Sequence, residues 1–270
     1  ADVFRWDETR KTDQFYLKYI DLQKSNNLFG PGLGCWIRVG EERWLDFSAN
    51  EYYQPDTTFI ISLSAGWNQI SNPLSYPIDW KKLLIRQTGE VVFDSISQQP
   101  EIVQPEIWWY NGYGYLPGDS IGFAPWLGYF VYAFTDCEVM INNPSPYFYQ
   151  EKEVISNSDS EGKDLLARSA TNGWLLYLTA RIGNFTDQYN IIGTSEKAKA
   201  GWDQYDLIEP ITGLGNGFIS LYSNNQFSPQ YPLAVDLREN RKPHEWRLIL
   251  KSNQINPVSY THLRAHETSL

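Results

Sequence analysis

The chain has 270 residues and a net charge of −10, with 32 acidic side chains against 22 basic ones. Nucleic acids and anionic membranes attract proteins through patches of Lys and Arg, so this charge and the scattered basic residues argue against both as partners. No stretch approaches the roughly 18 consecutive apolar residues of a membrane-spanning helix, and we expect no membrane insertion. The length allows one large domain or two smaller ones.

An internal repeat relates the beginning of the chain to its middle. Residues 34–39 align without a gap on residues 128–133, and upstream residues 4–7 align on residues 108–111. Aromatic residues, one glycine and alternating apolar positions recur together, which predicts one supersecondary unit used twice. The first copy lacks its beginning, so we expect the chain to be a fragment of a longer modular protein.

Short runs rich in aromatic and β-branched residues recur along the chain between Gly, Asn, Pro and Ser clusters, and they predict strands. Residues 128–133 and 138–142 are expected to form a hairpin around Thr135 and Asp136. Short strands separated by turn residues are typical of sandwiches and barrels. The predicted fold class is therefore all-β, as tandem sandwich-like or barrel-like modules with an internal repeat and little helix. Further strands are predicted over residues 59–63, 67–70, 174–182, 217–222, 233–236 and 245–251.

Two short segments are candidates for helix. Asp79 stands at an N-cap position, and Trp80, Leu83 and Leu84 behind it have the spacing of one helical face, which predicts a helix over residues 79–86. A second, shorter candidate covers residues 196–200.

A polar segment divides the chain into modules. Residues 149–171 are rich in Ser, Asp and Asn, a composition that predicts a linker. Residues 1–62 are expected to be the C-terminal part of a truncated repeat, residues 63–148 a complete repeat of the same β module, and residues 172–257 a second type of β-sandwich module. Residues 258–270 closely resemble the translated sequencing adapter of a metagenomic reading frame, so we expect a non-native tail; an ordinary polar tail is the alternative.

Three segments carry a resemblance to known proteins. Residues 65–74 read AGWNQISNPL, residues 108–110 read WWY, and residues 125–133 read PWLGYFVYA. The pattern resembles repeat modules of large bacterial extracellular proteins, which often carry type IX secretion sorting tails or flagellar-hook-cap-like immunoglobulin domains. Phe130 departs from it, because this position is usually Trp, and Cys35 stands where an aromatic is usual. The resemblance implies an extracellular or cell-surface location in a bacterium and carries over no catalytic residue.

Catalytic chemistry finds little support in the sequence. Outside the tail, His244 is the only histidine, so a Ser-His-Asp or Cys-His arrangement would have to use it; we favour a solvated loop histidine. One histidine with Cys35 and Cys137 makes no zinc cluster, and the sequence leaves open whether these cysteines form a disulfide or stay buried thiols. Glycoside hydrolysis needs paired carboxylates, but no Asp or Glu pair stands out. We therefore expect no enzymatic activity.

Four oxygen-bearing side chains form a candidate metal site. Asp187, Asn190, Asp203 and Asp206 lie in one acidic, glycine-containing segment. Hard oxygen ligands on loops are what Ca²⁺ requires, so Ca²⁺ is the one cofactor that the sequence suggests. The alternative is that these side chains are solvated acids and turn caps.

Aromatic residues supply a candidate ligand-binding site. Tyr113 and Tyr115 lie among turn glycines, and Trp126 follows them. Exposed aromatic rings stack on the apolar faces of sugars and anchor protein contacts, whereas the alternative places these rings in a sandwich core.

These features together predict a non-catalytic extracellular structural or adhesive module, a fragment of a bacterial modular secreted or cell-surface protein. The alternative function is an accessory carbohydrate-binding region of a secreted hydrolase. The expected partners are other domains of the parent protein, and a polysaccharide or cell-surface proteins.

Overall fold

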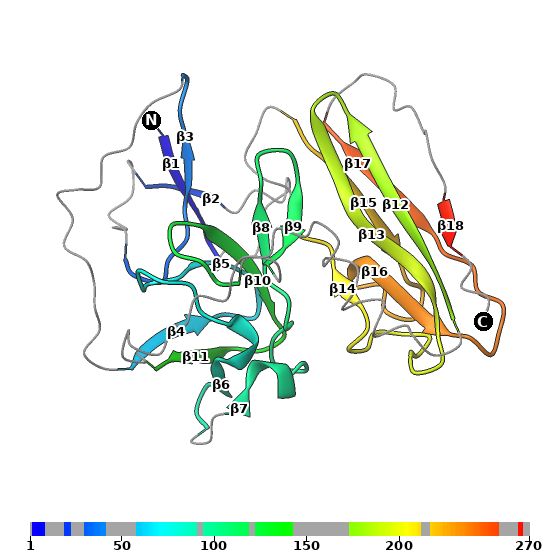
Figure 1. Ribbon diagram of the computed structural model, residues 1–270, viewed down its shortest axis with the longest axis horizontal. Coiled ribbons are helices and arrows are strands. Elements are labelled where there is room, and N and C mark those ends of the chain that lie inside the picture. Colours follow the sequence, from blue (N-terminus) through cyan, green and yellow to red (C-terminus); the bar gives the residue numbers. More distant parts are fainter. Residues whose placement is uncertain are drawn as a thin grey trace. The chain divides into compact units, whose positions relative to one another are not determined.

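The computed structural model divides into two compact units. The first comprises residues 1–109 and 118–156, and the second comprises residues 110–117 and 157–270. The described residues form β-strands and no α-helix, which confirms the all-β prediction (Figure 1). None of their helical turns is long and apolar enough to cross a membrane. The structure describes residues 2–8, 19–22, 30–41, 58–90, 94–118, 122–142, 173–211, 217–253 and 264–266; the predicted linker over 149–171 lies outside them.

The first unit is built around two sheets with one common core. Ile70 and Val131 of one sheet and Ile61 and Val139 of the other are buried in the same cluster, so the two sheets face each other as a β-sandwich. One sheet has the order β5 (Gly66–Ser71), β10 (Gly128–Ala133), β8 (Trp108–Tyr110) and β9 (Tyr115–Pro117), of which Tyr110 and β9 are counted with the second unit. The other has the order β4 (Phe59–Leu63), β11 (Cys137–Ile141), β6 (Leu84–Gln87) and β7 (Asp94–Ser95).

The predicted hairpin around Thr135 and Asp136 is wrong. β10 pairs with β5 and β8, whereas β11 pairs with β4 and β6, so the chain leaves one sheet after Ala133 and enters the other at Cys137. The chain also crosses between the sheets from β4 to β5, because β4 lies in the sheet of β11 and β5 lies in the sheet of β10. Because each strand buries one face in the common core, the alternation of apolar residues is the same for a crossing as for a hairpin.

The predicted helix over residues 79–86 is a single 3₁₀ turn, Trp80–Lys82. The Asp79 side chain caps it as expected, since its carboxylate accepts a hydrogen bond of 3.2 Å from the Lys81 amide. The chain then becomes β6, whose Ile85 is buried opposite Val139 of β11. Packing in the sheet here outweighs local helix propensity. Residues 196–200 form a turn and not the second predicted helix, and a second 3₁₀ turn covers Ile96–Gln98.

A smaller sheet of the first unit contains the first copy of the repeat. Phe4 lies opposite Trp36 in this sheet, and Trp108 lies opposite Phe130 in the larger one. The repeat aligns Phe4 with Trp108 and Trp36 with Phe130, so the two aligned stretches pair in the same register. The smaller sheet has the order β2 (Tyr19–Asp21), β1 (Asp2–Trp6) and β3 (Trp36–Arg38).

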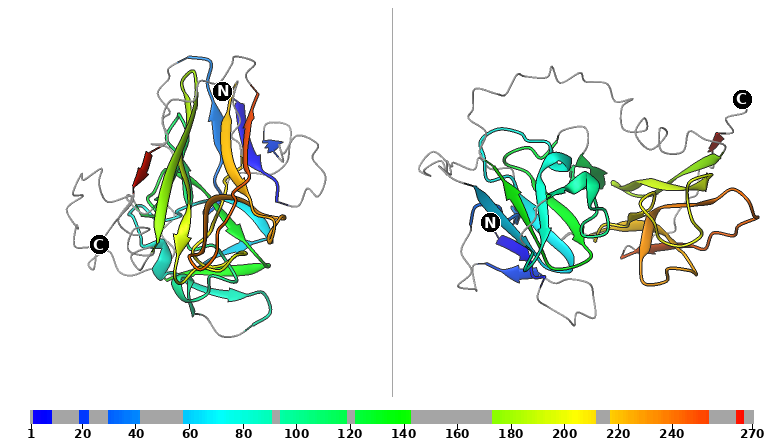
Figure 2. Two further views of the ribbon diagram at one scale, coloured as in Figure 1. Left: turned by 90° about the vertical axis from the view of Figure 1, so that its right-hand side faces the viewer. Right: turned by 90° about the horizontal axis from the view of Figure 1, so that it is seen from below.

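The second unit contains one seven-stranded sheet. Its longest strands, β12 and β13, form the hairpin drawn in yellow-green in Figures 1 and 2 and are joined by Gly183 and Asn184. Gly183 has φ +57°, as two-residue hairpin turns require. Ile182 of β12 and Ile219 of β15 pack in one cluster although their strands are not neighbours in the sheet, so the sheet curls around that cluster. The strands are β12 (Trp174–Ile182), β13 (Phe185–Ser195), β14 (Leu207–Ile208), β15 (Ile219–Asn224), β16 (Pro232–Glu239), β17 (Leu248–Ser252) and β18 (Arg264–His266), which lies in the tail over 258–270.

Candidate binding site

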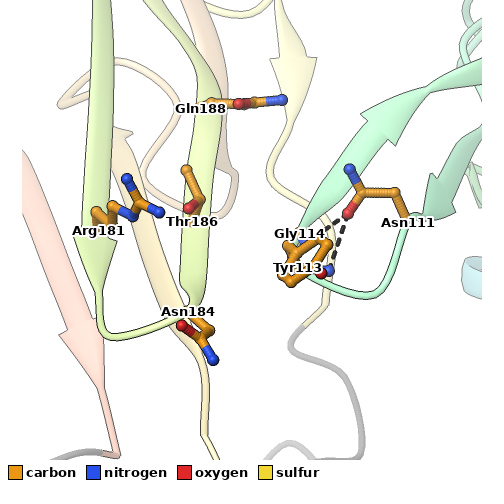
Figure 3. Close-up of a pocket in the computed structure, with 7 residues that line it drawn as sticks. All are labelled: Asn111, Tyr113, Gly114, Arg181, Asn184, Thr186 and Gln188. Carbon is orange, nitrogen blue, oxygen red and sulfur yellow. Dashed lines mark hydrogen bonds between the residues drawn. The ribbon is translucent and has the colours of Figure 1, made fainter.

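A polar pocket of about 270 Å³ opens in the second unit (Figure 3). Its walls present amide, hydroxyl and guanidinium groups together with one aromatic ring. The residues that line it are Asn111, Tyr113, Gly114, Arg181, Asn184, Thr186 and Gln188, all from the second unit.

One wall is the turn that joins β8 to β9. The Asn111 side-chain oxygen accepts hydrogen bonds from the amides of Tyr113, at 2.9 Å, and Gly114, at 3.0 Å. An Asn side chain used in this way replaces a backbone acceptor and stabilises the turn, while Gly112 adopts φ +97°. The turn holds Tyr113 outward with 61% of its surface exposed, so its ring is available to a ligand.

The other wall is the end of the β12–β13 hairpin. Arg181 lies opposite Thr186 across the two strands, and Gln188 shares a face with Thr186 because side chains alternate along a strand. The Thr186 amide donates a hydrogen bond of 3.0 Å to the carbonyl oxygen of Tyr113. A side chain on Gly114 would collide with the Thr186 carbonyl oxygen, so this close approach requires glycine.

The three predicted aromatic ligand contacts have different surroundings. Tyr113 lines the pocket and is exposed. Tyr115 is partly buried, and its ring packs edge-on against Tyr110 at a centroid distance of 5.3 Å. Trp126 is 68% exposed but belongs to the first unit, where it has φ +66°. Of the three, only Tyr113 contributes to the described pocket.

The four predicted calcium ligands separate into two pairs, and the first pair caps turns. Asp203 accepts hydrogen bonds from the amides of Tyr205 and Lys199, at 2.8 and 2.6 Å. Asp206 accepts from the amides of Asp203 and Leu237, both at 2.9 Å. Each carboxylate oxygen of this pair therefore already holds a backbone N–H group, as in the alternative that the sequence left open.

The second pair, Asp187 and Asn190, lies on β13 at an irregularity of the sheet. Asn190 lies opposite Leu178 and Asp187 lies opposite Ala180, so two residues of β13 face one residue of β12. Such a bulge shifts the alternation and turns Asp187 and Asn190 to the same face. Glu209 joins this pair, because the consecutive residues Ser220 and Leu221 donate hydrogen bonds to Glu209 and Asp187. Burial and then the negative charge of Asp187 raise the pKa of Glu209. Sequence reasoning missed Glu209.

A buried ion pair on β16 also escaped the sequence analysis. The Arg238 guanidinium donates to both carboxylate oxygens of Asp236, with Nε–Oδ1 at 3.0 Å and Nη2–Oδ2 at 2.8 Å. Nη1 donates to the Glu245 carbonyl oxygen at 2.9 Å. The signal was present, because two charged residues at i and i+2 in an apolar strand must share a face. All three guanidinium nitrogens and both Asp236 carboxylate oxygens therefore have a hydrogen-bond partner.

The cysteines and the histidine show no catalytic arrangement. Cys35 and Cys137 are both free thiols, so the structure answers the disulfide question in favour of two separate cysteines. Burial, followed by Asp136 and Glu138, raises the pKa of Cys137 to about 12, which keeps its thiol protonated. His244 Nε2 lies 2.6 Å from the Glu239 carbonyl oxygen, and no described hydrogen bond joins the ring to a Ser, Cys or carboxylate.

Within the part of the chain that the structure describes, no group of three His, Cys, Asp or Glu side chains is placed to hold a metal ion. The chain matches no family model, no curated protein and no solved structure.

Proposed function

We propose that the chain is a non-catalytic, extracellular adhesive module of a bacterial secreted or cell-surface protein, and that it contacts a saccharide through the polar pocket of the second unit. The observation that carries this proposal is the combination of the exposed Tyr113 ring with amide, hydroxyl and guanidinium side chains around one pocket. Aromatic rings cover the apolar face of a sugar, while a few placed polar groups bind its hydroxyls.

The chemistry of the pocket favours binding over cleavage. Glycoside hydrolysis uses two carboxyl groups on either side of the scissile bond, and the residues that line this pocket carry none. Arg181 is the single charged residue among them, in a chain whose net charge is −10. A guanidinium group binds a carboxylate well, so this pocket favours a saccharide with an isolated uronic acid, whereas the net charge of −10 disfavours a densely charged polyanion.

The alternative function, an accessory carbohydrate-binding region of a secreted hydrolase, uses the same pocket. The two functions differ in the parent protein, because an accessory region accompanies a catalytic domain that degrades the polysaccharide bound here.

Affinity electrophoresis of the full chain tests the proposal. The gels contain neutral polysaccharides (starch, β-glucan, xylan or mannan) or acidic ones (pectin or alginate). We expect retardation in at least one gel, and no release of reducing ends from the same polymer. Equal mobility in every gel would remove the saccharide proposal, and new reducing ends would contradict the non-catalytic one.

Replacing Tyr113 by Ala is expected to weaken retardation about tenfold, which corresponds to the loss of about 1.4 kcal/mol of ring stacking. The ring is 61% exposed, so the melting temperature should change by no more than about 2 °C. Trp126→Ala removes a ring that is 68% exposed and lies outside the pocket, and it should leave retardation unchanged. A large fall in the melting temperature of Tyr113→Ala would instead identify the ring as a structural element.

A further inference from the structure

Two acidic side chains of the second unit are held together by β15. Ser220 Oγ donates a hydrogen bond of 2.8 Å to Glu209 Oε1, and the amide of the next residue, Leu221, donates one of 2.6 Å to Asp187 Oδ2. Consecutive residues of one strand thus fix both carboxyl groups. Thr186 and Gln188 line the saccharide pocket, and Asp187 between them points to the opposite face of β13.

Other polar atoms of this cluster have no partner. Glu209 is 7% exposed and its Oε2 accepts no hydrogen bond. Asn190 is 3% exposed, and the oxygen of its amide has no hydrogen-bond partner. The Asn190 amide lies beside Asp187, and hydrogen bonding from it lowers the pKa of that carboxyl group. Buried polar atoms are almost always paired, so these orphaned atoms require an explanation.

No described cation balances the two carboxyl groups. Burial raises the pKa of Asp187 to about 6, against the smaller lowering effects of the Leu221 amide and Asn190. Burial, followed by the charge of Asp187, raises the pKa of Glu209 well above its usual value. Among the described residues, the ion pairs include neither Asp187 nor Glu209. Asp236 differs, since Arg238 binds both of its oxygens.

We propose that Asp187, Asn190 and Glu209 bind one divalent cation, and that this cation is Ca²⁺. The unpartnered oxygens of Glu209 and Asn190 join the Asp187 carboxylate as three hard donors, and two carboxylates balance two positive charges. Asp187 is partly exposed, and we expect water to complete the coordination shell. The set keeps two of the residues predicted from sequence and replaces the turn-capping Asp203 and Asp206 by Glu209.

Calcium titration of the EDTA-treated full chain at pH 7, followed by calorimetry and thermal melting, tests this site. Three protein ligands suggest a modest Kd of about 10⁻⁴–10⁻³ M, in the range of extracellular calcium modules. With 10 mM CaCl₂, about 10 to 100 times that Kd, the melting temperature should rise by about 5 °C. Mg²⁺ should produce a smaller shift, because it demands tighter geometry.

Glu209→Gln and Asp187→Asn should each abolish the calcium heat and the melting shift, whereas Glu196→Gln changes an exposed acid of the same unit and should preserve both. Both test substitutions keep the side-chain shape and remove a buried charge, so circular dichroism should show folded protein.

A wild-type chain that gives no binding heat and no melting shift with calcium overturns the proposal, as does calcium binding that survives in Glu209→Gln. If Glu209→Gln also melts higher than the wild type with and without calcium, the two carboxyl groups instead share a proton. The pocket variant Tyr113→Ala should bind calcium normally, which separates this site from the saccharide proposal.

Discussion

Replacing Arg238 by Met should lower the free energy of unfolding of the second unit by about 3–5 kcal/mol, the cost of leaving a buried charge without its partner. The Arg238 side chain is 2% exposed and that of Asp236 is 0% exposed. Ser223 and Asn225 also donate to Asp236, but both are neutral and cannot balance its charge. Urea unfolding followed by tryptophan fluorescence measures the loss, because Trp246 lies against the guanidinium at 4.9 Å.

The matched control is the ion pair between Arg38 and Asp2, whose side chains are 63% and 47% exposed. Arg38→Met should cost less than about 1 kcal/mol, because solvent screens an exposed pair. Adding Asp236→Asn to Arg238→Met should recover part of the lost stability, since it removes the unbalanced charge. A loss below about 1 kcal/mol for Arg238→Met would contradict the buried ion pair.

Replacing Phe123 by Ala should lower the stability of the first unit by about 3–5 kcal/mol, since a large buried ring is lost and a cavity remains. Phe123 is 0% exposed and packs edge-on against Trp80, at 5.4 Å, and Tyr129, at 5.2 Å. Its backbone is paired in both directions with Ile78, so the main chain cannot easily move to fill the space.

Chemical denaturation of the first unit measures this change. Ile60→Ala serves as the control, because Ile60 is 39% exposed on β4 and its truncation should cost about 1 kcal/mol or less. Equal losses for the two variants would contradict the place of Phe123 at the centre of the sandwich core.

The features that the sequence predicts correctly depend on local chemistry. Alternating apolar residues identify β10 and β11, and the Asn-Gly-Tyr-Gly stretch over residues 111–114 predicts a turn with an outward ring. The Asp79 cap is equally local, and it is present although the helix behind it is only one 3₁₀ turn.

The features that the sequence does not reveal depend on distant partners. β10 and β11 belong to different sheets, because their partners β5 and β4 lie far upstream, and alternation does not identify partners. Asp187 and Asn190 share a face only because of a bulge, and no neighbouring residue in the sequence predicts this bulge. Glu209 joins them because the sheet curls and brings β15 against β13. From the sequence alone, Glu209 after the short apolar run Leu207–Ile208 would be typical of a solvated loop.

Hydrogen–deuterium exchange of the full chain, with and without a mixture of neutral and acidic oligosaccharides, tests the central claim most directly, because it locates the bound ligand. The polar-pocket account predicts slower exchange in peptides that cover residues 110–117 and 181–188, and unchanged exchange in the sandwich of the first unit. Unchanged exchange throughout, or protection confined to other segments, would contradict the assignment of this pocket as the saccharide site.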